Sequence, residues 1–279
     1  MTERCEVCFA HCQIPEGKTG RCGARTNVDG EIVPTGYGKL TSLALDPIEK
    51  KPLHRFFPGS TILSVGSYGC NLMCPFCQNH SISMARPGKG LSVEYWEPEK
   101  LVRLAVSLKD RRNIGIAFTY NEPMINYEYI LDCAQLAKEE DLKIVLVTNG
   151  TAEKEILDKV LPYVDAMNID IKGFTEEYYR DFLKGDLGQV KRFIETAAKE
   201  CHVELTTLIV PEKNDSENDM RRLCAWIASL ESKEEIPLHV SRFFPAFKMA
   251  DSYPTPVRTV YHLKDVAKEY LKYVYTGNC

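Results

Sequence analysis

Three cysteines at the end of the first quarter of the sequence have a spacing that suits a metal centre. They are Cys70, Cys74 and Cys77, which form a C-x3-C-x2-C pattern. A [4Fe-4S] cluster has four irons, and four cysteines normally ligate them. Three thiolates would leave one iron open, and an open metal position is typical of a site that binds substrate rather than one that only holds structure. The pattern favours a [4Fe-4S] cluster with one accessible iron.

Other centres could use the same three thiols. His80 follows Cys77 at an x2 spacing, so a Cys3His zinc site is one alternative. A cluster with a distant fourth ligand, serving structure or electron transfer, is another. A plain electron carrier has no use for a pocket that holds a small molecule, so polar residues on later strands discriminate between these hypotheses.

A second group of cysteines lies at the N-terminus and consists of Cys5, Cys8, Cys12 and Cys22, with His11 beside Cys12. Their spacing matches neither the ferredoxin run nor a standard zinc ribbon. A structural zinc, a second iron–sulfur cluster and thiols without metal therefore all stay open. The total of 11 cysteines is odd and the first 12 residues are polar, without an apolar signal core. We expect a cytoplasmic protein with metal or redox chemistry rather than disulfides.

Composition excludes several classes of protein. The 279 residues are 44% apolar and 27% charged, as in an ordinary soluble globular protein of one large domain, with or without a small appendage. The net charge of -4 argues against general electrostatic binding of nucleic acid. The longest apolar runs, such as Ile144 to Val147, are far shorter than the roughly 20 residues of a membrane span.

Residues 1–58 differ from the rest because they are rich in Cys, Gly and Pro and contain only short strand-like pieces, at 31–35 and 39–45. So small a segment buries little core, and a bound metal would supply stability. The turn signal Pro58-Gly59 marks the predicted boundary. We therefore predict an N-terminal metal-binding segment over 1–58 and a second domain over 59–279.

The second domain alternates strands with helices. Strand-like runs are expected at 61–67, 114–119, 143–148, 166–171, 203–210 and 238–243, and helical patterns at 101–108, 130–137, 190–198, 216–230 and 259–273. Six such units predict an α/β fold with a parallel sheet, either a partial (β/α)6 TIM-like barrel or an open sheet. In both, the site lies at the carboxyl ends of the strands.

The three-cysteine loop resembles a known family. A C-x3-C-x-aromatic-C motif after the first strand is the signature of the radical S-adenosylmethionine (radical SAM) superfamily. The resemblance implies that Cys70, Cys74 and Cys77 hold three irons and that SAM chelates the fourth. It also places Phe76 near the adenine.

Motifs at later strand ends extend this resemblance. Asn121-Glu122-Pro123 stands where the family has a Gly-Gly-Glu-Pro type motif, which implies that Glu122 holds the SAM amino group, although Asn121 replaces the usual glycine. Comparable strand ends in glycyl-radical-enzyme activases touch SAM. By this resemblance the further SAM contacts are Thr148, Asp170, Lys172, Thr206 and His239. The residues alone leave two alternatives open, a local Asp170–Lys172 salt bridge and a core histidine at 239.

Several stretches resemble one subfamily, the radical SAM enzymes of the AmmeMemoRadiSam system, often labelled pyruvate formate-lyase-activating-enzyme-like. They include 46–53, 241–245 and 273–278, although relatives commonly continue beyond the last of these with a cysteine-containing tail. The resemblance implies an anaerobic oxidoreductase that cleaves SAM to a 5′-deoxyadenosyl radical. The implied partners are flavodoxin or ferredoxin as reductant and a glycyl radical enzyme as target. Radical modification of a small molecule or another macromolecule is the alternative, and an iron–sulfur electron carrier a further one.

Overall fold

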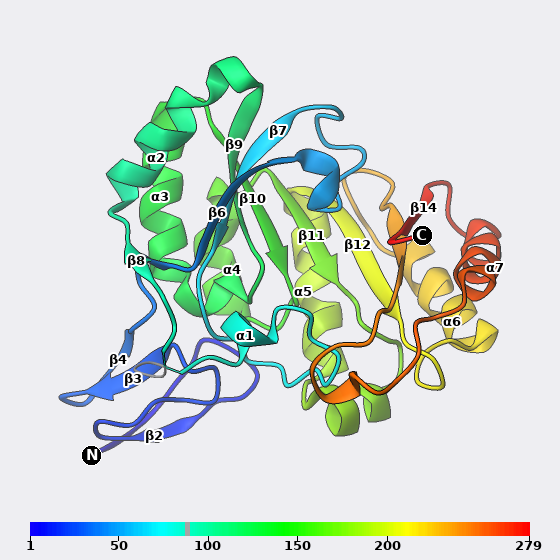
Figure 1. The fold of residues 1–279 in the computed structure, drawn as a ribbon, viewed down its shortest axis with the longest axis horizontal. Coiled ribbons are helices and arrows are strands. Elements are labelled where there is room, and N and C mark those ends of the chain that lie inside the picture. The colour runs from blue at the N-terminus through cyan, green and yellow to red at the C-terminus, as the bar shows by residue number, and fades with distance from the viewer. Residues whose placement is uncertain (87–89) are drawn as a thin grey trace.

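An eight-stranded sheet forms the centre of the fold in the computed structural model, which describes residues 1–86 and 90–279 (Figure 1). Its order is β14-β13-β12-β11-β10-β9-β7-β6, and all neighbours are parallel except β6, which runs antiparallel to β7. The strands are β6 Ser42–Pro47, β7 Thr61–Gly66, β9 Asn113–Thr119, β10 Lys143–Thr148, β11 Ala166–Asp170, β12 His202–Ile209, β13 Leu238–Arg242 and β14 Val274–Gly277. This is the predicted partial barrel, with β6 and β14 at its edges.

Helices cover the outside of this sheet, from its β9 side to its β13 side (Figure 1). Strands such as β9 and β12 are nearly continuously buried, as expected for parallel strands covered by helices. The helices are α1 His80–Ser83, α2 Pro98–Ser107, α3 Tyr127–Glu139, α4 Lys154–Val160, α5 Leu187–Glu200, α6 Glu217–Ala228 and α7 Val257–Lys268.

Local sequence signals explain where these helices begin and which face they bury. Ser216 caps α6, because its side chain accepts a hydrogen bond from the backbone of Asp219 at 3.1 Å, as the sequence predicts. In α5 the predicted stripe that includes Val190, Phe193 and Ile194 is fully buried against the sheet. Capping and amphipathic spacing therefore place the helices on the outer face.

The sheet differs from the prediction at both edges. The last helix ends at Lys268 rather than near residue 273, and the chain then forms β14, a seventh parallel strand that we did not predict. At the other edge, residues 42–47 form β6 and pair with β7, so the main sheet begins before the predicted boundary at residue 58. Such edge strands depend on a partner strand that local sequence does not reveal.

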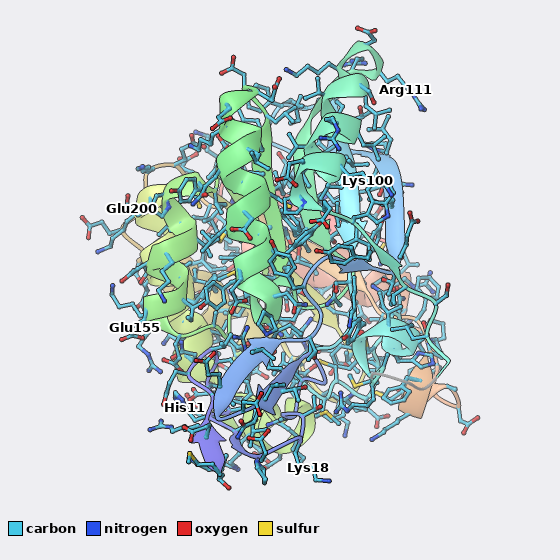
Figure 2. All side chains as sticks on the ribbon, turned by 90° about the vertical axis from the view of Figure 1, so that its left-hand side faces the viewer. His11, Lys18, Lys100, Arg111, Glu155 and Glu200 are labelled. Carbon is cyan, nitrogen blue, oxygen red and sulfur yellow. The ribbon has the colours of Figure 1, made fainter. Side chains whose placement is uncertain are left out.

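The N-terminal residues form small antiparallel pairs outside the main sheet. These are β1 Thr2–Arg4 with β2 Gln13–Pro15, β3 Arg25–Val28 with β4 Glu31–Pro34, and β5 Lys39–Leu40 with β8 Glu94–Tyr95. In Figure 2, His11 and Lys18 lie at the end of the molecule opposite Arg111, which precedes β9. The N-terminal pairs therefore lie at the carboxyl end of the strands, beside α1 (Figure 1). None of the helices in the described part of the chain is long and apolar enough to cross a bilayer.

Candidate active site

A cavity of about 370 Å³ opens at the carboxyl ends of the barrel strands. Its volume lies within the range of small-molecule and cofactor sites. Parallel strands end at one edge of the sheet, so residues far apart in the sequence meet there. The cavity brings together nearly all the site residues predicted for the barrel, namely Cys70, Cys74, Phe76, Cys77, Asn121, Glu122, Thr148, Asp170, Lys172 and Thr206.

The cysteine loop leaves β7 through a tight turn at Gly69. This residue has φ +88°, and a Cβ there would lie 2.5 Å from the carbonyl oxygen of Cys22, so both conformation and space require glycine. The backbone N–H of Cys70 donates to that same carbonyl at 3.1 Å. The loop is therefore held against the N-terminal segment as well as against the barrel.

Asn121 has a structural task that the sequence did not suggest. Its Oδ1 accepts from the backbone N–H of Ser67 at 3.1 Å, and its Nδ2 donates to the carbonyl of Gly69 at 3.0 Å. The side chain thus ties the end of β9 to the start of the cysteine loop. Asparagine in place of the family's glycine adds a link between two neighbouring strand ends.

The three thiols of the loop face one cavity in different surroundings. Burial raises the pKa of Cys70 and of Cys74, the latter to about 11. Two polar groups reach sulfur, because Asn149 Nδ2 donates to Cys70 Sγ at 3.7 Å and the Ser83 hydroxyl lies 3.2 Å from Cys77 Sγ. Three soft sulfur ligands, one of them with an amide donor beside it, suit a group with three metal positions, such as a cubane cluster.

The zinc alternative with His80 gains no support from the geometry. The His80 ring stacks on Phe247 at 4.8 Å between centroids, and His80 is not among the residues that line the cavity. Across residues 1–86 and 90–279, no group of three or more His, Cys, Asp or Glu side chains is placed to hold a single metal ion.

Glu122 is a fully buried carboxyl group on the wall of the cavity. It accepts hydrogen bonds from the Thr148 hydroxyl at 2.7 Å, from the backbone of Asn149 at 2.7 Å and from that of Met124 at 3.0 Å. Burial raises its pKa to about 7, although these donors work in the opposite direction. The group is a carboxylate held by neutral donors, and an ammonium ligand would supply the missing positive charge.

Asp170 and Lys172 lie at the end of β11 and form an ion pair, with Lys172 Nζ 2.8 Å from Asp170 Oδ2. Burial alone would lower the pKa of Lys172, but the neighbouring charges of Asp170 and Cys74 raise it. The local salt bridge that we considered is therefore present. Both residues also line the cavity, so the pair presents a carboxylate and an ammonium to a ligand.

The remaining wall is mixed in character. Phe76 is buried beside the cavity, with its ring 5.9 Å from that of Phe182 between centroids. Thr206 of β12 donates to the side-chain oxygen of Asn168 on β11 at 2.9 Å. An apolar ring on one side and fixed polar groups on another suit a ligand with a base and a ribose.

His239 does not line the cavity, and our expectation for this residue needs correction. Its Nε2 lies 2.6 Å from the buried carboxylate of Glu204, and its ring stacks on Tyr275. His239 is the second residue of β13, whereas Ser241, two residues further toward the carboxyl end, lines the cavity. The alternation of side chains shows which face of the strand a residue is on, but its position along the strand decides whether its side chain reaches the mouth of the cavity.

The four N-terminal cysteines lie together in a second, smaller cavity lined also by Asn71, the residue after Cys70. His11 is not among the residues that line this cavity. Its Nε2 instead lies 3.2 Å from a carboxylate oxygen of Glu153. All 11 cysteines are free thiols in this structure.

Sequence reasoning missed several cavity residues. Asn149, Asn168, Ser241 and Lys51 all contribute to the cavity wall. The first three sit within three residues of a predicted strand end, which is a usable signal. Lys51 had no such signal, because it is placed by the Asp46 carboxylate at 2.8 Å and by the face of Tyr120 at 5.0 Å.

A comparison with known families decides the affiliation. The family model of the radical SAM superfamily matches residues 64–224, more than half of the chain. The chain belongs to the radical SAM superfamily. Membership implies a [4Fe-4S] cluster and SAM, and the cavity has the donor set for both. The matched region runs from β7 to α6 and contains the three-cysteine loop, Glu122 and the Asp170–Lys172 pair.

The chain is also similar to individual proteins and to solved structures. An uncharacterized protein of Methanocaldococcus jannaschii is 43% identical over 280 residues, covering 99% of this chain and 81% of that protein. The pyruvate formate-lyase-activating enzyme of Clostridium pasteurianum is 26% identical, covering 61% of this chain and 71% of that enzyme. The structure of Streptococcus suis SuiB bound to S-adenosylmethionine has a TM-score of 0.56 at 12% identity, over 76% of this chain and 48% of that one, which shows a common fold.

Proposed function

We propose that this radical SAM protein holds its [4Fe-4S] cluster with Cys70, Cys74 and Cys77 and binds SAM in the 370 Å³ cavity above them. When bound and reduced, the cluster would supply one electron to SAM, and cleavage of the C5′–S bond would give methionine and a 5′-deoxyadenosyl radical able to remove a hydrogen atom from a substrate. The observation that carries the proposal is the convergence of three thiols and the buried Glu122 carboxylate on one cavity.

The chain's own residues would orient SAM. Glu122, once ionised, accepts hydrogen bonds from the ammonium group, which places the amino acid end of SAM beside the loop. Lys172 offers its ammonium to the carboxylate of SAM, while Asp170 and Thr206 offer acceptors and a hydroxyl to the ribose. Phe76 supplies an apolar surface for the adenine. The buried wall also limits water around a reactive radical.

We further propose that the substrate is a glycine Cα of a partner protein. The likeness to a pyruvate formate-lyase-activating enzyme supports this class. The rim of the cavity carries the exposed side chains of Lys50 and Gln78, which leaves the mouth polar and open to a peptide segment. Flavodoxin or ferredoxin is the proposed one-electron donor.

The test of the first step is anaerobic reconstitution with iron and sulfide, followed by dithionite and SAM. We expect 5′-deoxyadenosine from the native protein and none from Cys74→Ala, with Cys133→Ala, a buried cysteine in α3, as the matched control. A correctly loaded protein that binds SAM but yields no 5′-deoxyadenosine would overturn the proposal.

The substrate class needs a separate readout. A peptide with a central glycine deuterated at Cα should transfer deuterium to 5′-deoxyadenosine, detected by mass spectrometry. The same peptide with alanine at that position should transfer none. Formation of unlabelled 5′-deoxyadenosine with the glycine peptide would contradict the glycine substrate and leave SAM cleavage intact.

A further inference from the structure

The N-terminal cysteines form a second sulfur-lined cavity that the proposed SAM chemistry does not use. Cys5, Cys8 and Cys22 are buried and Cys12 is half-buried, and all four line the same small space. They come from the turns around β1 and β2 and from the loop before β3. The rest of the lining is mostly apolar, with Val7, Ala10, Ile14 and Ile125.

Each of these sulfurs has a backbone N–H beside it. For three of them the donor is the backbone N–H two residues further along the chain. Val7 lies beside Cys5, Ala10 beside Cys8 and Ala24 beside Cys22. The backbone of Arg21 donates to Cys12 Sγ at 3.5 Å. Hydrogen bonds of this kind to ligand sulfur are one means by which a protein tunes an iron–sulfur cluster.

The same arrangement occurs in the loop that carries the proposed SAM cluster. There the backbone of Leu72 donates to Cys70, again from two residues ahead. The two cysteine groups thus share a local backbone pattern, although their sequence spacings differ. The pattern therefore supports metal-bound sulfur in both places.

A buried cation completes the surroundings of this cavity. Arg25 lines it and is only 4% exposed. Its two terminal nitrogens bind Glu128, at 2.7 and 3.0 Å, whereas its buried Nε–H has no hydrogen-bond partner among the described residues. An unpaired buried donor is costly, and a group with acceptor sulfurs inside the cavity would satisfy it.

The spacing of the sulfurs separates a single metal ion from a cluster. A zinc ion needs its sulfurs at about 2.3 Å. In a cubane each sulfur binds a different iron, so the four sulfurs lie further apart. The described side chains place no group of three ligands around one ion, which fits the wider spacing.

We propose that Cys5, Cys8, Cys12 and Cys22 ligate a second [4Fe-4S] cluster. Its protein surroundings adjoin those of the first, because the Cys70 N–H donates to the Cys22 carbonyl and the Asn71 side chain reaches Cys8. Two reduced clusters with adjoining surroundings should interact magnetically. The proposal does not depend on SAM cleavage, because it concerns the ligands of a separate centre.

The experiment is metal and sulfide analysis of the full chain after anaerobic reconstitution, with electron paramagnetic resonance of the dithionite-reduced protein. We expect about eight irons per native chain, since each cubane holds four. The triple variant Cys70→Ala, Cys74→Ala, Cys77→Ala should keep about four, with the spectrum of one isolated cluster. The double variant Cys5→Ala, Cys8→Ala should also keep about four and lose the magnetic interaction.

The triple variant keeps the test decisive if the double variant fails to fold, because its N-terminal cysteines are intact. Zinc in place of iron in that variant would overturn the cluster and indicate a structural ion. Absence of any bound metal in a folded triple variant would overturn the site altogether. Cys224→Ala, which removes a buried cysteine of α6 away from both cavities, should leave the iron content unchanged.

Discussion

The side-chain amide of Asn149 donates a hydrogen bond to Cys70 Sγ at 3.7 Å. The backbone N–H of the same asparagine donates to the Glu122 carboxylate at 2.7 Å. One residue at the end of β10 therefore joins a proposed cluster ligand to the proposed ammonium acceptor. Any shift of this strand end would move both groups together.

Loss of the Asn149 amide should lower the reduction potential of the cluster. Hydrogen bonds to ligand sulfur stabilise the more negative, reduced state. A bond worth ~1 kcal/mol corresponds to roughly 40 mV for a one-electron couple. We expect Asn149→Ala to show a drop of that order in a redox titration followed by paramagnetic resonance. Asn113→Ala, which removes a buried asparagine at the opposite end of β9, is the control and should leave the potential unchanged.

SAM binding should weaken as the pH falls below about 7. The pKa of Glu122 is raised by burial to about 7, and only its ionised form accepts from an ammonium group without competition from its own proton. Affinity should therefore fall about tenfold per pH unit on the acid side. Titration calorimetry of the reconstituted protein from about pH 6 to about pH 8, roughly one unit on either side of the pKa, measures the affinity for SAM.

Glu122→Gln is the matched variant for that dependence. It keeps the shape but removes the charge, so SAM affinity at pH 8 should fall roughly tenfold to a hundredfold and become flat with pH. A Gln variant that retains the native pH profile would show that another group is responsible.

Gly69→Ala should destabilise the cysteine loop. The added Cβ would meet the Cys22 carbonyl at 2.5 Å, and φ +88° is itself unfavourable for alanine. We expect a loss of more than about 1 kcal/mol in unfolding free energy, together with lower iron retention. Gly17→Ala shares a positive φ of +68° but meets nothing within 4 Å, so it isolates the conformational cost from the clash. Equal effects of the two substitutions would argue against the close approach.

Glu204 should contribute stability that is lost in acid. It is fully buried and accepts from the backbone of Arg55, with His202 and His239 beside it. Burial alone would raise its pKa, but these partners lower it to about 2. The contribution, on the order of 3 kcal/mol, is present above the unfolded pKa near 4.5 and is lost as the pH falls towards about 2.

Urea unfolding of the native protein and of Glu204→Gln checks this contribution. The difference in unfolding free energy should be largest near neutral pH and should narrow steadily below about pH 4.5. A difference that stays constant down to about pH 3 would mean that packing rather than charge makes Glu204 important.

Much of the barrel and its site could be predicted because the signals are local. The spacing of Cys70, Cys74 and Cys77 lies within one loop, and Glu122, Asp170 and Lys172 stand at the ends of strands that alternate with amphipathic helices. A parallel topology then brings strand ends to one edge whatever the exact packing. Short-range pattern and chain topology were therefore sufficient for the fold class, whereas most of the cavity residues were named through the resemblance to the radical SAM family.

The tertiary structure alone decided the remaining relationships. Local pattern does not show the pairing of the edge strands β6 and β14 with the sheet. It also does not show the contact of His239 with Glu204 or the hydrogen bond from Asn149 to Cys70. The N-terminal cysteines likewise gather only because their turns pack on the barrel, where Cys8 bridges to Ala152. Such contacts depend on how segments that are far apart in the sequence pack together, and the spacing of residues along the chain does not determine that packing.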